Sequence, residues 1–209
     1  MLPATQLPAI ITALPTIPYQ RACHRIVDFA ILTAFDPMMP LYTLGPGLNG
    51  QRYTPIGGPT ALYVAEDLVT ALAEYNRVER AVLVNDPTYQ MKANPTVQLT
   101  IQTSLERVLD LTDPAVQTAL NTSTTELTGP WRKQMIKKLF CPTHVLADAV
   151  YADGKIQAMR YPSARGTDRA NLVIWDDRVQ LPSTILIKDS TGTLSARIPA
   201  KRPYRKGSL

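Results

Sequence analysis

Prolines restrict the fold of this chain more than any other residue type does. The sequence has 18 prolines against 10 glycines in 209 residues, and each proline fixes a backbone torsion and lacks an N–H donor. Stiff loops and short elements are therefore expected, and a bundle of long helices is not. The length fits one domain with a real core, and a hydrophobic fraction of 45% is too high for a disordered chain.

Strands and helices are mixed in the first part of the chain, and strands predominate in the last part. Apolar runs and turn signals predict strands at 61–65, 81–84, 97–102, 156–161, 171–175, 184–188 and 193–198, the last two joined by a hairpin turn at 189–192. Helices are predicted at 67–79, 114–120, 130–139 and 144–151, while 21–31 fits a short strand or helix. Asp113 should cap the second helix, and Gly154 should end the last. This order predicts an α+β fold, a single domain with mixed or antiparallel sheets.

The two ends of the chain differ in composition from its middle. Residues 1–19 are proline-rich and predict an irregular lead-in, residues 20–200 predict the folded domain, and residues 201–209 form a basic tail. The formal charge of +5 lies partly in this tail. A solvated end and an arm that contacts nucleic acid both fit such a tail.

The cysteines and the apolar runs bear on the compartment. The N-terminus lacks the basic start of a signal peptide, and no apolar run reaches the roughly 18 residues of a membrane span. Cys23 and Cys141 have neither metal-ligand spacing nor a disulfide framework. A cytoplasmic chain with two free, buried thiols and no metal is expected. His24 and His144 are expected to be structural, with neither of them activating a cysteine.

Arg52 and Glu74 are the first two candidate site residues. Arg52 lies in a glycine-rich loop, where a guanidinium can hold a phosphate through two parallel hydrogen bonds. It could equally tie its own loop to a neighbouring carboxylate or carbonyl. Glu74 lies at the edge of the apolar stripe of its predicted helix, from which a carboxylate can face a cleft. An ordinary pair with Arg77 is the alternative for Glu74.

Tyr63 and Ser163 complete the set that the residues themselves suggest. Tyr63 lies within an apolar strand, where its ring would pack in the core or stack on a flat or cationic ligand ring. Ser163 follows a predicted strand and could donate to a ligand or to the backbone. An arginine, a tyrosine, a glutamate and a serine from separate elements would suit a ligand that carries phosphate and ribose.

Four segments together resemble the RES domain, the toxin half of a group of bacterial toxin–antitoxin pairs. Arg52 and Tyr53 in NGQRYTP resemble the family's Gly-Gly-Arg-aromatic element, and LYVAEDLVTALAE at 62–74 resembles its tyrosine strand and glutamate helix. VLDLTDPAV at 108–116 and RYPSARGTDRANLVIWDD at 160–177 resemble its middle and serine segments. Gln51 stands where a second glycine is usual, and Thr54 stands where asparagine is common, which affects the expected shape of the loop.

The resemblance implies a fold related to the diphtheria-toxin type of ADP-ribosyltransferase, with NAD as the substrate. It implies that Arg52, Glu74 and Ser163 are catalytic, and that Arg52, Tyr53, Tyr63 and Ser163 bind substrate. Glu74 would stabilise the positive charge that develops on the ribose, and Arg52 would hold the diphosphate. Tyr63 would stack on the nicotinamide ring.

The resemblance also implies partners, and two alternative functions stay open beside it. It implies an Xre-like helix-turn-helix antitoxin, a possible homo-oligomer or toxin–antitoxin hetero-oligomer, no membrane, and contact with nucleic acid only through the antitoxin. NAD would be consumed by hydrolysis or phosphorolysis. ADP-ribosylation of a protein target is one alternative, and a basic nucleic-acid-binding module is another.

Overall fold

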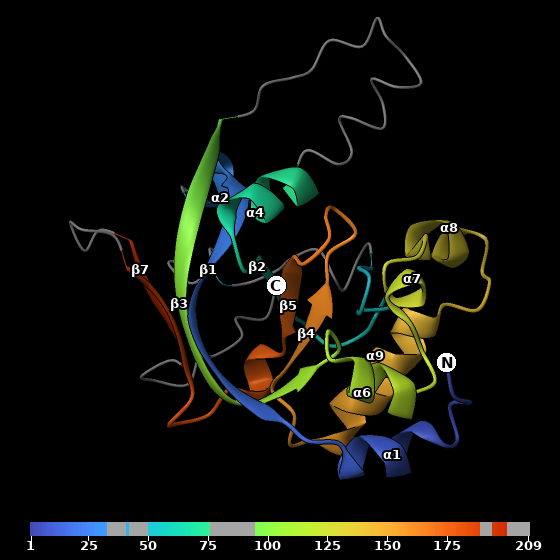
Figure 1. Ribbon diagram of the computed structural model, residues 1–209. Helices are drawn as coiled ribbons and strands as arrows, with labels where there is room; N and C mark the ends of the chain where they lie inside the picture. The colour runs from blue at the N-terminus through green and yellow to red at the C-terminus, as the bar shows by residue number, and fades with distance from the viewer. Residues whose placement is uncertain (33–40, 42–49, 76–94, 189–193, 200–209) are drawn as a thin grey trace, which may run out of the picture.

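The computed structural model describes residues 1–32, 41, 50–75, 95–188 and 194–199 (Figure 1). The helices in this part of the chain are α1 (Leu7–Ala13), α2 (Phe29–Leu32), α4 (Leu68–Tyr75), α6 (Pro114–Ala119), α7 (Thr124–Leu127), α8 (Trp131–Ile136), α9 (Pro142–Asp153) and the 3-10 helix η1 (Asp176–Arg178). The strands are β1 (Ile17–Asp28), β2 (Leu62–Ala65), β3 (Thr96–Asp110), β4 (Ala158–Pro162), β5 (Ala170–Ile174), β6 (Thr184–Lys188) and β7 (Ser195–Ile198).

Within the described residues the strands form one seven-stranded sheet in the order β1-β2-β5-β4-β3-β6-β7. β1 also pairs with β3 over most of its length, which closes the first five strands into a ring. β3 and β4 run parallel, and the other pairings are antiparallel. The sheet is therefore mixed, and the predicted α+β fold is confirmed.

β5 lies between two hydrophobic cores, and all five of its residues are buried. Because side chains alternate along a strand, Leu172 and Ile174 enter a core made mainly by strands. Val173 faces the opposite way, into a core shared with α1, α6 and α9. These helices lie together on one side of β4 and β5 (Figure 1). The second core supports the strand ends that carry the candidate site.

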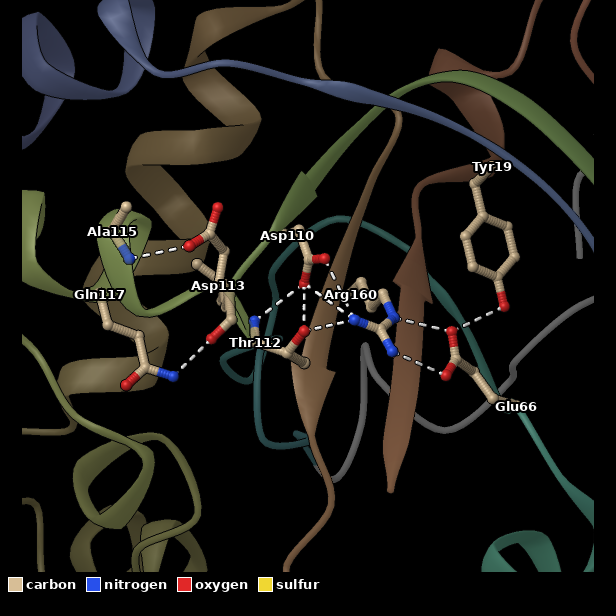
Figure 2. A network of polar contacts seen from close by, with 9 residues as sticks. Tyr19, Glu66, Asp110, Thr112, Asp113, Ala115, Gln117 and Arg160 are labelled. Atoms are coloured by element: carbon tan, nitrogen blue, oxygen red, sulfur yellow. Dashed lines mark hydrogen bonds and ion pairs between the residues drawn. The ribbon is translucent and has the colours of Figure 1, made fainter. Parts of the chain in front are cut away.

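A network of charged side chains joins β4 to its neighbours (Figure 2). Arg160 contacts Glu66 through two bonds, Nε to Oε1 at 2.7 Å and Nη2 to Oε2 at 3.0 Å. Its Nη1 donates to Asp110 Oδ2 at 3.1 Å and also to Thr112. Tyr19 donates to Glu66 Oε1 at 3.0 Å. The network ties β4 to the end of β3 through Asp110 and, across β5, to the residue that follows β2, with each charge paired as burial requires.

Several local predictions are confirmed. Asp113 caps α6 by accepting from the N–H of Ala115 at 2.8 Å. Gly154 follows α9 with a φ of 77°, the left-handed conformation that glycine adopts without strain. The segment 21–31 is chiefly strand, because β1 continues to Asp28. Both cysteines are free and buried.

The predicted irregular lead-in is wrong for much of residues 1–19. Helix α1 spans Leu7–Ala13, and β1 begins at Ile17. Leu7 and Ile11, four residues apart, are 0% and 1% exposed, and α1 packs against α9. The proline count misled the prediction, since a proline within the first helical turn does not disturb a helix.

Two element lengths also differ from prediction. β3 extends to Asp110, and the alternation of buried residues continues past the predicted end at 102 as far as Leu105. α8 ends at Ile136, and Leu139 is 58% exposed instead of stacking on the helix. Lys138 takes a φ of 53°, which breaks the helical path. The predicted strand 81–84, the turn 189–192, the helix beyond Tyr75 and the tail 201–209 lie outside the described residues.

Candidate active site

Glu74 and Ser163 meet although one lies on helix α4 and the other follows strand β4. Ser163 Oγ donates to Glu74 Oε1 at 3.0 Å. Ser163 is 5% exposed, whereas the side chain of Glu74 is 32% exposed. Asp67 caps α4 by accepting from the Thr70 N–H at 2.8 Å, which starts the helix that carries Glu74. The serine is enclosed, and the carboxylate is accessible from solvent.

Two further residues hold this pair, and neither was among the predicted site residues. Asn171 on β5 donates from Nδ2 to Glu74 Oε1 at 3.3 Å and is 4% exposed. The N–H of Arg165 donates to Ser163 Oγ at 3.1 Å, and its Nε lies 3.9 Å from Glu74 Oε2. A polar asparagine in the apolar run ANLVI was the available signal, because a buried amide requires partners.

Arg52 binds neighbouring backbone carbonyl groups, which is one of the two roles that the sequence allowed, and it also lines a cleft. Its Nη1 donates to the carbonyl oxygens of Leu127 and Gly129, both at 2.9 Å. These bonds fasten the loop after α7 to the loop before β2. Arg52 still lines a cleft, and Nη1 accounts for two of its five N–H donors. The guanidinium can therefore serve both roles.

The hydroxyl of Tyr63 fixes the loop that carries Arg52. It accepts from the N–H of Tyr53 at 3.1 Å and shares a 2.8 Å hydrogen bond with Thr54 Oγ1. Burial raises the pKa of the Tyr63 hydroxyl, so it stays protonated. The Tyr63 side chain is half-buried. Its hydroxyl is thus occupied by the loop, and only its ring remains for a ligand.

The Tyr53 side chain is buried away from the surface that a ligand could reach. The structure therefore does not support its predicted direct contact with substrate. Tyr53 is 1% exposed, and its ring centre lies 4.5 Å from that of Tyr161. Tyr161 precedes Ser163 by two residues and so faces the same side of the sheet. Tyr53 acts through packing, since it links the arginine loop to the strand that ends at the serine.

His144 and Cys141 lie close together at the start of α9, although neither histidine was expected to act on a cysteine. His144 Nε2 hydrogen-bonds the carbonyl oxygen of Gln51 at 2.8 Å. Burial alone would raise the pKa of Cys141, but hydrogen bonds from His144 and Thr143 lower it by more. Burial likewise opposes protonation of His144, while Cys141 and the Gln51 carbonyl raise its pKa overall. The spacing of three residues at a helix start was the signal for this pair.

A basic cleft of about 540 Å³ lies beside Arg52. Its walls come from the loop before β2, the turn and helix of α8, and the loop after β4. The described lining residues are Arg52, Thr128, Gly129, Pro130, Trp131, Arg132, Lys133, Ile136, Lys137, Ala164 and Arg165. Arg165 connects the cleft to the Glu74–Ser163 pair. The arrangement can bind an anion next to a fixed carboxylate.

Neither a metal centre nor a membrane-spanning helix is found in the described part of the chain. No group of three His, Cys, Asp or Glu side chains there could hold a metal ion. No described helix has the length and apolar character to cross a bilayer.

Comparison with known proteins adds a family and a fold. The model of the RES domain family matches residues 21–195, well over half of the chain. A chain in the crystal structure of the M. tuberculosis MbcT–MbcA toxin–antitoxin complex has a similar fold, with a TM-score of 0.65 and 19% sequence identity. That match covers 88% of this chain and 89% of the other. No curated protein matches the sequence.

Proposed function

Because the chain belongs to the RES domain family, we propose that it is the toxin of a toxin–antitoxin pair and that it consumes NAD. The proposed reaction cleaves the bond between the nicotinamide nitrogen and the ribose. The solved structure of similar fold is a toxin–antitoxin complex, which supports an antitoxin as the partner. An Xre-like helix-turn-helix antitoxin, bound in a hetero-oligomer, is the partner we propose.

The observation that carries this proposal is the oriented carboxylate of Glu74. Its Oε1 accepts from Ser163 at 3.0 Å and from Asn171 at 3.3 Å, while solvent still reaches the side chain. When the glycosidic bond breaks, its electron pair moves to the nicotinamide nitrogen and positive charge develops on the ribose. A carboxylate that is already oriented stabilises this charge without the cost of reorganisation.

The acceptor completes the reaction on the ribose carbon. Water would add its oxygen there and release a proton, giving ADP-ribose and neutral nicotinamide. Inorganic phosphate would add in the same way and give a phosphorylated ADP-ribose. A protein side chain as acceptor would give an ADP-ribosylated protein, so the alternative function differs only in this step.

The remaining residues bind and position the substrate. The N–H groups of Arg52 that do not contact Leu127 and Gly129 hold the diphosphate. The ring of Tyr63 stacks on the cationic nicotinamide, while its hydroxyl stays bound to the loop. Ser163 donates a hydrogen bond from its hydroxyl to Glu74, which makes it a positioning residue for the carboxylate.

Nicotinamide release from NAD tests the proposal directly. The purified chain, free of antitoxin, is assayed with and without inorganic phosphate beside Glu74→Gln. The matched control is Glu106→Gln, which removes an exposed carboxylate of β3. We expect Glu74→Gln to lower kcat by about 10²–10³-fold, as removal of a preorganised electrostatic group does, and the control to keep full activity. Full turnover by a folded Glu74→Gln protein would refute the proposed role.

The products then identify the acceptor. Free ADP-ribose indicates water, and dependence of the rate on phosphate indicates phosphorolysis. Label from NAD that appears on a protein indicates ADP-ribosylation. A folded wild-type protein that neither releases nicotinamide nor labels a protein would contradict the enzymatic proposal altogether.

A further inference from the structure

The cleft beside Arg52 carries more positive charge than one diphosphate requires. Its described lining contains no acidic residue and includes five cationic ones from three separate parts of the chain, namely Arg52, Arg132, Lys133, Lys137 and Arg165. Cations gathered in a recess repel one another and attract anions from solution. Such a lining therefore indicates a ligand with several negative charges.

Three of these cations belong to α8 and the residue after it. Lys133 and Lys137 are four residues apart and lie on the same face of the helix. Arg132 is held beside them, because its guanidinium carbon lies 5.1 Å from the centre of the Trp131 ring. All three cationic side chains are exposed, and none forms an ion pair with a carboxylate of the described residues.

The remaining two cations are arginines, and one of them also contacts the carboxylate of Glu74. Arg165 Nε is 3.9 Å from Glu74 Oε2, and Arg52 extends from the loop held by Tyr63. Two guanidinium groups match the roughly two negative charges of a dinucleotide diphosphate. The cations of α8 are then left for a second phosphate. A phosphate monoester would supply about −1.5 to −2 charge at pH 7.

We propose that this site cleaves NADP as well as NAD and prefers NADP, with the 2′-phosphate of its adenosine ribose bound by Arg132, Lys133 and Lys137. The inference rests on the proposed function, because it names the substrate class of the same site. The 2′-phosphate is the only group by which NADP differs from NAD. Ile136, which is 71% exposed, and Pro130 give apolar surface beside these cations for the adenine ring.

Steady-state kinetics with the two dinucleotides test the preference. Nicotinamide release is measured from NAD and from NADP at constant ionic strength, without phosphate, for wild type and for Lys133→Gln/Lys137→Gln. Lys138→Gln is the matched control, because Lys138 is an exposed cation of the same segment that does not line the cleft. We expect kcat/KM to be about 10-fold higher for NADP, in the range of one lost charge-assisted contact. The double variant should lose this preference, and the control should keep it.

A second arm separates the 2′-phosphate from free phosphate as the occupant of the α8 cations. If NAD with added inorganic phosphate reaches the rate of NADP, and the double variant abolishes that stimulation, the cations serve the acceptor and the proposal is wrong. Equal kcat/KM values for NAD and NADP in wild type would also overturn it.

The affinity for fragments of the dinucleotide can be measured without any cleavage, so it tests the 2′-phosphate site independently of the proposed function. Calorimetry compares adenosine 2′,5′-bisphosphate with adenosine 5′-monophosphate, which lacks only the 2′-phosphate. Tighter binding of the bisphosphate to wild type but not to the double variant supports the phosphate site even if no dinucleotide is cleaved, in which case the proposed function alone fails. Equal binding of the two nucleotides overturns the inference while leaving NAD cleavage to be judged by nicotinamide release.

Discussion

Ser163 Oγ donates a hydrogen bond to Glu74 Oε1 with a distance of 3.0 Å between the two oxygens, although 89 residues separate the two in sequence. The same hydroxyl oxygen accepts from the N–H of Arg165, so the serine connects the carboxylate to the loop that borders the basic cleft. Its proton is directed at protein and not at a ligand. In this position Ser163 acts on the reaction through the orientation of Glu74.

Ser163→Ala should therefore reduce turnover more than binding. The change removes one of the two hydrogen bonds that described residues donate to Glu74 Oε1 and leaves that of Asn171, so the carboxylate samples other orientations and stabilises the ribose charge less. We expect kcat to fall about 10-fold or more with KM nearly unchanged, the pattern of an interaction that matters only in the transition state. Ser183→Ala is the control, because Ser183 is also buried and hydrogen-bonded but contacts Gln157 instead. A rise in KM with unchanged kcat would indicate that Ser163 binds substrate directly.

Tyr63→Phe should weaken binding through the loop of Arg52. Removal of the hydroxyl leaves the N–H of Tyr53 and the hydroxyl of Thr54 without their partner, and a buried unsatisfied donor costs about 1–3 kcal/mol. We expect the free energy of unfolding in urea to fall by this amount and KM for NAD to rise, because Arg52 is held less firmly. An unchanged unfolding free energy would mean that the hydroxyl does not fix the loop.

Tyr53→Phe, unlike Tyr63→Phe, should not lower the free energy of unfolding. Among the described residues Tyr53 Oη has no hydrogen-bond partner, and the side chain is 1% exposed. Removing a buried hydroxyl that lacks a partner relieves its desolvation cost, while the ring keeps its contact with Tyr161. We expect an unfolding free energy equal to wild type or higher by up to about 1 kcal/mol, with normal turnover. A loss of more than about 1 kcal/mol would show that the hydroxyl has a partner in solution.

Local sequence signals were sufficient where a feature depends on a few neighbouring residues. The Asp113 cap, the Gly154 helix end and β5 all follow from such signals and are present. The predictions failed where a longer context decides. The burial of Leu7 and Ile11 stabilises helix α1 within the proline-rich N-terminal segment. Burial of residues beyond the predicted end of β3 accompanies its extension to Asp110.

The candidate site shows the same limit. Glu74 and Ser163 were selected from their positions in the sequence and from the family resemblance, and the structure brings them into contact. Asn171 was missed because its partner is set by the pairing of β4 with β5, in which Asn171 lies opposite Tyr161. His144 was predicted to be structural, but its contact with Gln51 was not predicted, because it joins segments 93 residues apart. No spacing in a single sequence reports such a closure of the sheet or packing of a helix.

The charged network around Arg160 should make the fold sensitive to acid through Glu66. Burial raises the pKa of Glu66, but the hydrogen bonds and charge of Arg160, with the Tyr19 hydroxyl, lower it by more, so it lies below the ordinary value of 4.5. A carboxyl whose pKa is lower in the folded state stabilises the fold above the unfolded pKa, and this stabilisation is lost as pH falls through the folded pKa. The loss should therefore occur below pH 4.5.

Glu66→Gln tests both the size and the pH dependence of this contribution. The side chains of Glu66 and Arg160 are 13% and 23% exposed, so removal of one partner should cost about 3 kcal/mol at neutral pH, as for other largely buried pairs. Below pH 4.5 the difference from wild type should shrink, because wild-type Glu66 becomes protonated as well. Urea unfolding at a series of pH values measures this, with Glu106→Gln as the exposed control. A difference that stays constant down to acidic pH would mean that the charge of Glu66 contributes nothing, and that shape alone explains the loss.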